Sequence, residues 1–276
     1  MTLFFDESGT ALVGVGGDGC FVVGGIAIRG ETTAVAATWG QRRPKKKGTK
    51  FNRDEFLEVA EFLSENGIVP VTSFSRLDDE DRRRAKKKAK DLAAARIQAA
   101  DGEQKKAGEG CVAWMQQVSL TVLPAVLGSL PFVHGPMANV EIAIDQFAVP
   151  SWMHDDAERL IARWSDPAFR VQPILDALDT QQPGHPDIAQ LRKNIQTVPG
   201  SIQVDWRAEG SLHHLSDAVA AMYRKALSDE PDARQAWDVL TTRYRRDGRI
   251  PAGMNFDLTK VMKDSLGRPW PERRSS

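Results

Sequence analysis

Three acidic residues lie inside apolar segments, where a neutral residue would pack more easily. Asp6 follows the apolar run at 3–5, Asp145 ends the run IAI at 142–144, and Asp217 interrupts a helix-like segment. Carboxylates in such places are commonly neutralised by a basic side chain or a bound metal ion. These residue types therefore permit a metal site built from oxygen ligands.

Carboxylates of this kind suit Mg²⁺ or Mn²⁺, which bind oxygen ligands together with substrate phosphates. Two such ions about 4 Å apart can activate a water molecule and stabilise the leaving oxygen of a phosphodiester. The chain contains 37 Asp and Glu residues, however. By spacing alone, surface acids and turn formers explain the three residues equally well.

The elements that must position these acids follow from hydrophobic periodicity. Period-two or continuous apolar runs predict strands at 3–5, 20–28, 68–74, 139–147, 169–175 and 201–206. Helical periodicity predicts helices at 51–66, 78–107, 111–130, 155–164, 184–195, 211–227 and 231–244. The glycines at 14–19 match a dinucleotide-binding spacing, but strands flank them on both sides, which favours a hairpin.

Charge is locally concentrated although Lys plus Arg equal Asp plus Glu at 37 each. Two dense basic segments, 41–50 and 82–90, are typical of solvated faces but also suit phosphate backbones. In a neutral protein we favour nucleic-acid binding. The candidate phosphate-binding residues are Arg42, Arg43, Lys45, Lys46, Lys47, Lys50, Arg83 and Lys87. Trp39 beside the first segment is better explained by packing than by base stacking.

Four motifs together resemble a known family. They are FFDESG at the N-terminus, FVVGGIAI in the second strand, IAIDQF in mid-chain, and VDW followed by LHHLSDAVAAMY. This set is similar to the domain of unknown function 3800 family, whose members resemble ribonuclease H-like nucleases and integrases. The resemblance implies an α/β fold with a ribonuclease H-like mixed β-sheet flanked by helices and a helical insertion.

The resemblance also implies a site. Family positions fall on Asp6 with Glu7, on Asp145 and on Asp217, and they imply catalysis by these four residues. Asp6, Asp145 and Asp217 are the implied metal ligands, while Glu7 should face opposite to Asp6 in a regular strand.

Related enzymes often add a fourth carboxylate or a histidine near the metals, and here the auxiliary candidates are Asp205, His213 and His214. The two histidines are equally well explained as helix-surface residues. His214 and Ser216 depart from the family pattern of Gln and Ala. We also expect the helix that the family has soon after the second strand to be shortened here and replaced by the basic loop around Lys45.

We therefore expect a ribonuclease H-like domain at 1–228 with a basic helical insertion at about 78–130, and a C-terminal helix and basic tail at 229–276 packed on it. The expected function is a Mg²⁺- or Mn²⁺-dependent nuclease acting on DNA or RNA. A non-catalytic nucleic-acid-binding module on the same fold is the alternative. No apolar run approaches the ~20 residues of a membrane span and no targeting segment is recognisable, so we expect a cytoplasmic protein without a membrane partner.

Overall fold

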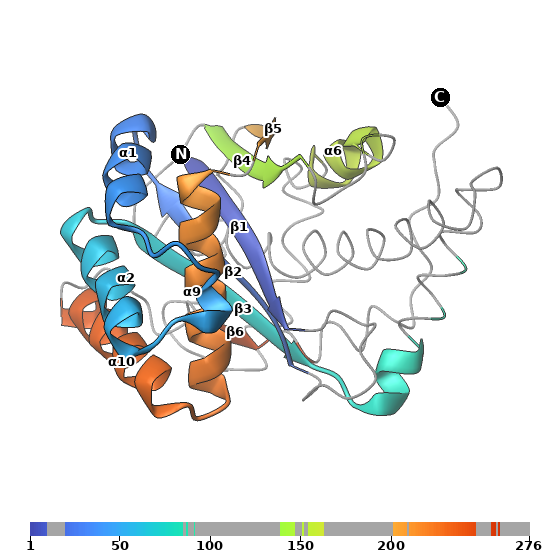
Figure 1. Ribbon diagram of the computed structural model, residues 1–276. Coiled ribbons are helices and arrows are strands. Elements are labelled where there is room, and N and C mark those ends of the chain that lie inside the picture. Colours follow the sequence, from blue (N-terminus) through green and yellow to red (C-terminus); the bar gives the residue numbers. More distant parts are fainter. Residues whose placement is uncertain are drawn as a thin grey trace.

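A computed structural model of the chain describes residues 1–9, 20–84, 139–146, 154–162, 201–208, 210–246 and 255–257, with positions 87, 91, 151 and 259. Within these residues the protein is an α/β structure with a six-stranded mixed sheet in the order β5-β4-β1-β2-β3-β6. Helices pack on this sheet (Figure 1). The strands are β1 (Thr2–Gly9), β2 (Cys20–Ile28), β3 (Val69–Arg76), β4 (Asn139–Asp145), β5 (Ser201–Arg207) and β6 (Asn255–Asp257).

β1 lies near the centre of the sheet, between an antiparallel neighbour and a parallel one, and β6 at the far edge runs parallel to β3. On one side β1, β2 and β3 form an antiparallel meander. On the other side β4 runs parallel to β1, and β5 runs parallel to β4. β1 and β2 carry long apolar runs because a central strand is covered on both faces, and every residue of β2 is buried.

The described helices are α1 (Thr33–Arg42), the 3₁₀ turn η1 (Gly48–Lys50), α2 (Arg53–Glu65), α6 (His154–Ala162), α9 (Ser211–Leu227) and α10 (Pro231–Arg246). α9 lies on the sheet across β1 and β2, while α1, α2, α10 and η1 contact α9 (Figure 1). α6 packs against β5. α9 therefore makes the main contact of this helical layer with the sheet, and α2 also touches β3.

Small residues let α9 approach the sheet closely. A Cβ atom added to Gly24 would lie 2.5 Å from the Ala220 Cα atom, a distance that real Cβ contacts do not reach. The Ser216 hydroxyl lies 3.1 Å from the carbonyl oxygen of Phe4 and can donate to it, and Leu212 offers a second acceptor in the preceding turn. The backbones of α9 and β2 are thus in direct contact at Gly24.

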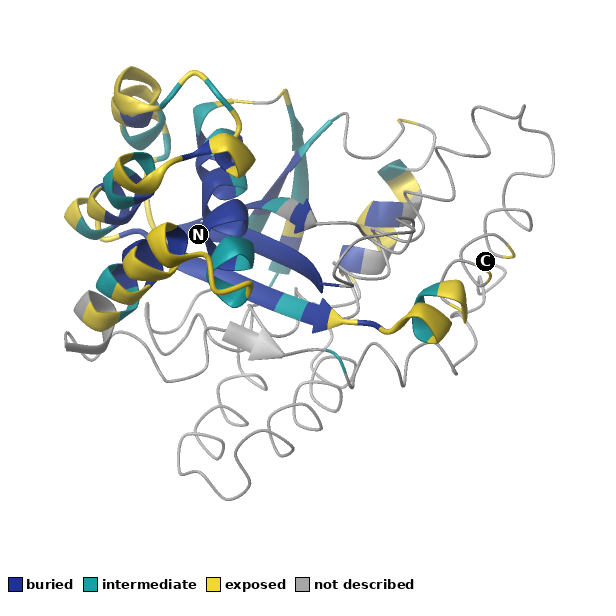
Figure 2. Cartoon of the chain, turned by 60° about the horizontal axis from the view of Figure 1, so that its bottom comes forward, coloured by how far each residue is buried: buried dark blue, intermediate teal, exposed yellow. Residues whose placement is uncertain are grey.

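The helical layer has its own apolar interior. Trp39 of α1 is completely buried, and its ring lies 4.9 Å from that of Phe62 in α2. Figure 2 shows the buried residues gathered on the sheet and on the inner sides of the helices, with exposed residues on the outer sides. α2 begins with a capping box: the Asn52 side chain accepts from the Glu55 N–H, and the Glu55 carboxylate accepts from the Asn52 N–H. Such a cap stabilises a helix by about 1 kcal/mol.

The structure confirms most of the predicted elements that it describes, with boundaries shifted by a few residues. β1 to β5, α2, α6, α9 and α10 all lie where the periodicity predicted them, and β1 and β2 pair as the antiparallel arms of a hairpin. Pro70 of β3 pairs with Ile26 on one side and lies outside the 72–74 stretch that pairs with β6. Trp39 is a packing residue, as expected.

One expectation was wrong, and one strand was missed. A helix does follow the second strand, because 33–42 forms α1, so the basic loop is shorter than predicted. β-branched threonines and Gly40 hid this helix, whose stability comes from burying Trp39 and not from propensity. β6 was not predicted, since three residues carry too little periodicity. The glycine loop at 14–19, the strand at 169–175, the helices at 111–130 and 184–195, and most of the helix at 78–107 lie outside the described residues.

In the part of the chain that the structure describes, no helix is both long enough and apolar enough to cross a membrane.

The close contact at Gly24 makes a testable prediction. Gly24→Ala should destabilise the protein by about 3 kcal/mol, because the new methyl group must push α9 away from β2. Gly40→Ala is the matched control: the same change inside exposed α1 meets only the movable Ser211 hydroxyl and should be neutral or slightly stabilising. Urea denaturation followed by circular dichroism measures both. Equal effects of the two substitutions would contradict the close-packing explanation.

Candidate functional site

Asp6 lies on the face of the sheet that α9 covers. Asp6 pairs with Gly24 across the antiparallel β1–β2 ladder, and directly opposite residues point to the same face. A Cβ atom at Gly24 would point at Ala220 of α9, so Asp6 faces that side as well. Asp6 is half-buried, and it has an interaction partner in the structure.

Strand register brings Asp145 to the same face and to the same level as Asp6. The parallel β1–β4 ladder aligns Phe4 with Ala143. Asp6 and Asp145 each follow that pair by two residues, and side chains two residues apart share a face. Asp145 is the last residue of β4, while Asp6 lies within β1 just beyond its parallel pairing with β4. The carboxyl end of a parallel strand is where ligands bind in open α/β sheets. Asp145 is half-buried too.

A cation, Arg207, lies on the same face at the end of β5. Its guanidinium forms an ion pair with Glu141 at 2.5 Å and a second ion pair with Asp205, and it lies 5.6 Å from the centre of the Phe4 ring. Asp205, expected as an auxiliary site residue, is therefore neutralised by Arg207. Sequence reasoning missed Arg207, although a basic residue directly after the strand motif VDW was a usable signal.

Two further polar residues at the contact between β1 and α9 are buried. Ser8, two residues beyond Asp6 on the same face, is buried, and its hydroxyl has no hydrogen-bond partner within the described part of the chain. A buried hydroxyl normally has a partner, so Ser8 is available to bind a ligand beside Asp6. His213 is also buried, with its ring 5.3 Å from that of Phe4 at an edge-to-face angle of 81°. His213 is thus a packing residue between α9 and β1 and not a helix-surface residue.

Asp217 has a different environment from that of Asp6 and Asp145. Its Oδ2 atom accepts a hydrogen bond of 2.7 Å from the backbone N–H of Gly48 in η1. The neighbouring His214 ring contacts the carbonyl oxygen of Lys46 through Nε2 at 2.9 Å. Both polar groups at this part of α9 therefore bind the basic segment. The side chain of Glu7 lies outside the described set.

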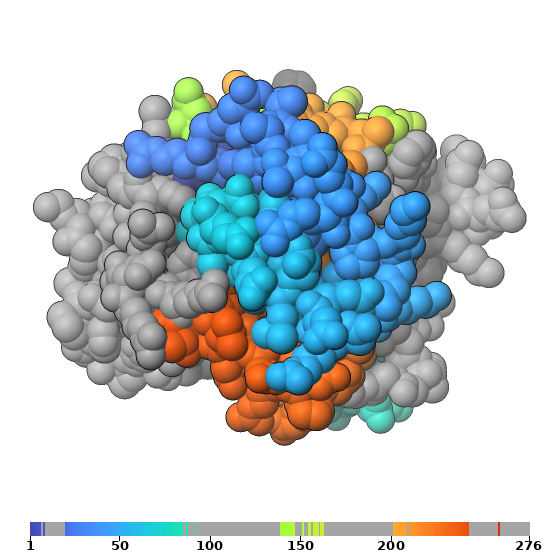
Figure 3. Space-filling model, turned by 60° about the vertical axis from the view of Figure 1, so that its left-hand side comes forward, coloured from blue at the N-terminus to red at the C-terminus, as the bar shows by residue number. Residues whose placement is uncertain are grey.

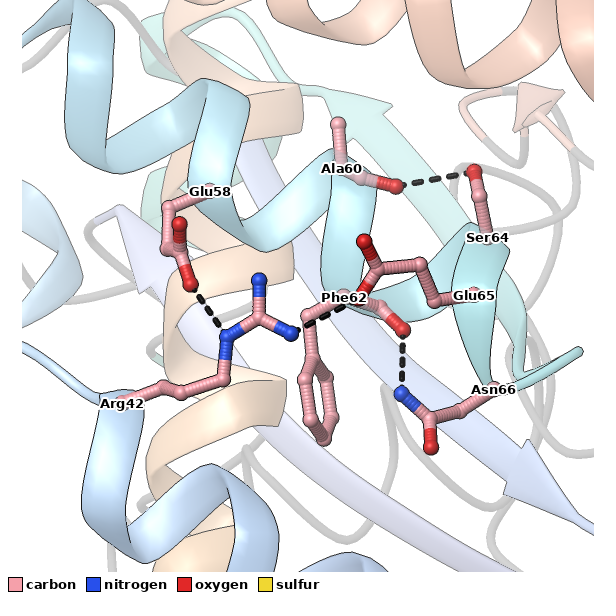
Figure 4. A network of polar contacts seen from close by, with 7 residues as sticks. All are labelled: Arg42, Glu58, Ala60, Phe62, Ser64, Glu65 and Asn66. Atoms are coloured by element: carbon pink, nitrogen blue, oxygen red, sulfur yellow. Dashed lines mark hydrogen bonds and ion pairs between the residues drawn. The ribbon is translucent and has the colours of Figure 1, made fainter.

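The basic residues of the first segment fall into two groups. Arg42 binds Glu58 at 2.6 Å and Glu65 at 2.7 Å, and these hydrogen bonds raise its pKa (Figure 4). Lys46 forms an ion pair with Glu55 at 2.8 Å. The other four cations are exposed and form no ion pair with a described residue: Arg43, Lys45, Lys47 and Lys50. In the second segment Arg83 and Lys87 are exposed as well.

The described residues contain no group of three or more His, Cys, Asp or Glu side chains close enough together to hold a metal ion. The geometry thus brings Asp6 and Asp145 to one face, assigns Asp205 to Arg207, and links Asp217 to Gly48. A pair of carboxylates still fits a divalent ion, since Mg²⁺ commonly uses one or two carboxylates and keeps several waters. The buried Ser8 hydroxyl adds a polar group beside that pair.

Comparison with known proteins does not add a family assignment. No protein-family model matches the chain, and no curated protein is significantly similar to it. The likeness to the domain of unknown function 3800 family therefore rests on the sequence motifs themselves.

The attachment of the basic segment to α2 depends on the ionisation of Glu55. Partial burial raises the pKa of the Glu55 carboxyl. The hydrogen bonds from Lys46 and from the Asn52 N–H together lower it by more than that, so the net pKa lies below the ordinary 4.5. A lowered pKa means that Glu55 stabilises the fold above that ordinary value, and that this contribution is lost as the pH falls through the folded-state pKa.

Glu55→Gln tests this contribution, because glutamine can keep the capping box but cannot form the ion pair with Lys46. We expect the variant to be less stable by about 0.5 to 1 kcal/mol at pH 7. The difference should shrink as the pH falls below the ordinary pKa of 4.5 and disappear below the lowered folded-state pKa, where the parent carboxyl is also protonated. Thermal unfolding between pH 3 and 8 measures this. Glu61→Gln, on the exposed side of α2, is the control and should show no such pH-dependent difference.

Proposed function

We propose that the protein is a divalent-metal-dependent nuclease with a ribonuclease H-like fold. The proposal is supported chiefly by one observation: the β1–β4 register, continued by two residues, puts Asp6 and Asp145 on one face where β4 ends. The mixed sheet, with β1 between an antiparallel and a parallel neighbour, is compatible with that fold. The nucleic acid would be bound by its phosphates through the exposed cations of the basic segment.

Asp6 and Asp145 would hold Mg²⁺ or Mn²⁺ in this proposal. The bound ion would activate water for attack on the scissile phosphate and stabilise the leaving oxygen. The protein contributes the rest. Arg207 holds Glu141 and Asp205 in ion pairs, and the proposal assigns the metal to the other two carboxylates of this face, Asp6 and Asp145. Ser8 presents a buried hydroxyl on the same face.

A non-catalytic nucleic-acid-binding module is the second candidate. Two observations favour it: Asp217 is hydrogen-bonded to Gly48, and the described residues hold no group of three potential metal ligands. In this function the acids of the sheet would serve packing and charge balance, and the basic segment alone would bind phosphates.

Cleavage assays separate the two functions. Labelled single- and double-stranded DNA and RNA are incubated with Mg²⁺, Mn²⁺ or EDTA and with the parent chain, Asp6→Asn or Asp145→Asn. The nuclease proposal expects cleavage that needs the metal and falls at least about 100-fold in both variants, because each removes a charged ligand. Asp238→Asn, on the exposed side of α10, is the matched control and should cleave like the parent.

Unchanged thermal unfolding of the variants would exclude loss of folding as the cause. No cleavage of any substrate, together with salt-sensitive binding that Asp6→Asn and Asp145→Asn retain, would favour the binding module.

A further inference from the structure

The basic segment between α1 and α2 is fastened to α9 at several points, although only the three-residue η1 gives it regular structure. Gly48 donates its N–H to Asp217, and the carbonyl oxygen of Lys46 contacts the His214 ring. Gly48 is buried, and a Cβ atom there would lie 2.7 Å from the Ala218 Cα atom. The segment therefore lies directly on the backbone of α9, where Figure 1 shows it crossing that helix.

The contacts with α9 involve the inner side of the segment, and its outer side is exposed. The cations Arg43, Lys45, Lys47 and Lys50 are exposed, while Arg42 and Lys46 are paired with acids of α2. Figure 3 shows this stretch of chain, in mid-blue, at the surface beside α2. Four cations within eight residues of a segment fixed at its centre form a compact positive surface.

We propose that Asp217 is a positioning residue that anchors this basic segment and so arranges its exposed cations for binding the phosphate backbone of nucleic acid. This proposal rests on the proposed function for the identity of the partner, but it does not require metal or cleavage. It gives Asp217 a role different from the metal-ligand role that the family resemblance implies. The link also makes the phosphate-binding surface continuous with the helix that covers Asp6.

Anchoring affects affinity because a flexible segment must become ordered when it binds nucleic acid. If Gly48 is released, the chain between α1 and α2 gains conformational freedom that nucleic acid must remove again, which weakens binding. Each cation held against a phosphate also releases counterions, with a slope of about −0.9 in log K against log salt per contact on duplex DNA. An unanchored segment should therefore bind more weakly and with a shallower salt dependence.

Asp217→Asn and Asp217→Ala separate anchoring from charge. Both substitutions remove the negative charge, but asparagine keeps a side-chain oxygen that can accept from the Gly48 N–H. We expect Asp217→Ala to weaken binding of a labelled DNA duplex of about 20 base pairs about tenfold, with a shallower slope of log K against log salt. Asp217→Asn should bind within about twofold of the parent. Fluorescence anisotropy in EDTA, over a range of salt concentrations and with single-stranded DNA and RNA in parallel, measures this without any contribution from metal or cleavage.

Gly48→Ala reaches the same contact from the other side and should reproduce the loss seen with Asp217→Ala, because a methyl group has no room against Ala218. Gly48→Ala also tests the proposal if Asp217→Ala does not fold. Asp238→Ala and Asp238→Asn form the matched control pair on the exposed side of α10 and should both bind like the parent. Circular dichroism and thermal unfolding report the folding of every variant.

Equal binding by Asp217→Asn and Asp217→Ala would overturn the proposal, whether both bind more tightly through loss of a negative charge or both bind more weakly. Parent protein that binds no nucleic acid at low salt, or that binds anionic phospholipid vesicles instead, would also overturn it. A nuclease assay without cleavage would overturn the catalytic proposal alone, because the anisotropy readout contains no cleavage step.

Discussion

The close approach of α9 to β2 is the constraint on which the rest of the described structure depends. The Gly24 backbone touches Ala220, so no side chain separates helix from sheet at this point. Such an approach fixes the height and direction of α9 over β1, because packed interiors tolerate shifts of only a few tenths of an ångström without a cost in free energy. α1, α2, α10 and η1 then pack on α9. Their positions relative to the sheet thus depend on that contact region, with α2 also touching β3 directly.

The same contact determines the polar face of the sheet. Because Gly24 faces α9, its pairing partner Asp6 does so too, and the parallel register extends that face to Asp145 and Arg207. Charges on a partly buried face must be balanced, since their interactions are screened less than in water. Arg207 provides part of that balance through Glu141 and Asp205. This face of the sheet therefore carries several acids together with the cation Arg207.

Asp217 belongs to the second surface of α9, where the helix meets the basic segment. Its bond with Gly48 joins the most basic part of the described chain to the helix that covers the acidic face. Arg42 and Lys46 are likewise committed to acids of α2, so only part of the positive charge of the segment is directed outward. The charge of the sequence is thus sorted by packing into cations that hold the fold and cations that remain available to a partner.

Hydrophobic periodicity by itself determined most of the strands and helices that the structure describes, as in 20–28 and 211–227, because burial on one face imposes a period that can be recognised locally. It also identified Asp6, Asp145 and Asp217 as acids in apolar surroundings. Only the tertiary structure decided that Asp6 and Asp145 share a level, that Arg207 neutralises Asp205, and that Asp217 binds Gly48. The first and third pairs are separated by 139 and 169 residues. Arg207 and Asp205 are only 2 residues apart, but Arg207 also binds Glu141, which is 66 residues away. Side-chain direction and strand register create such contacts, and local periodicity contains no information about which distant segment will lie alongside.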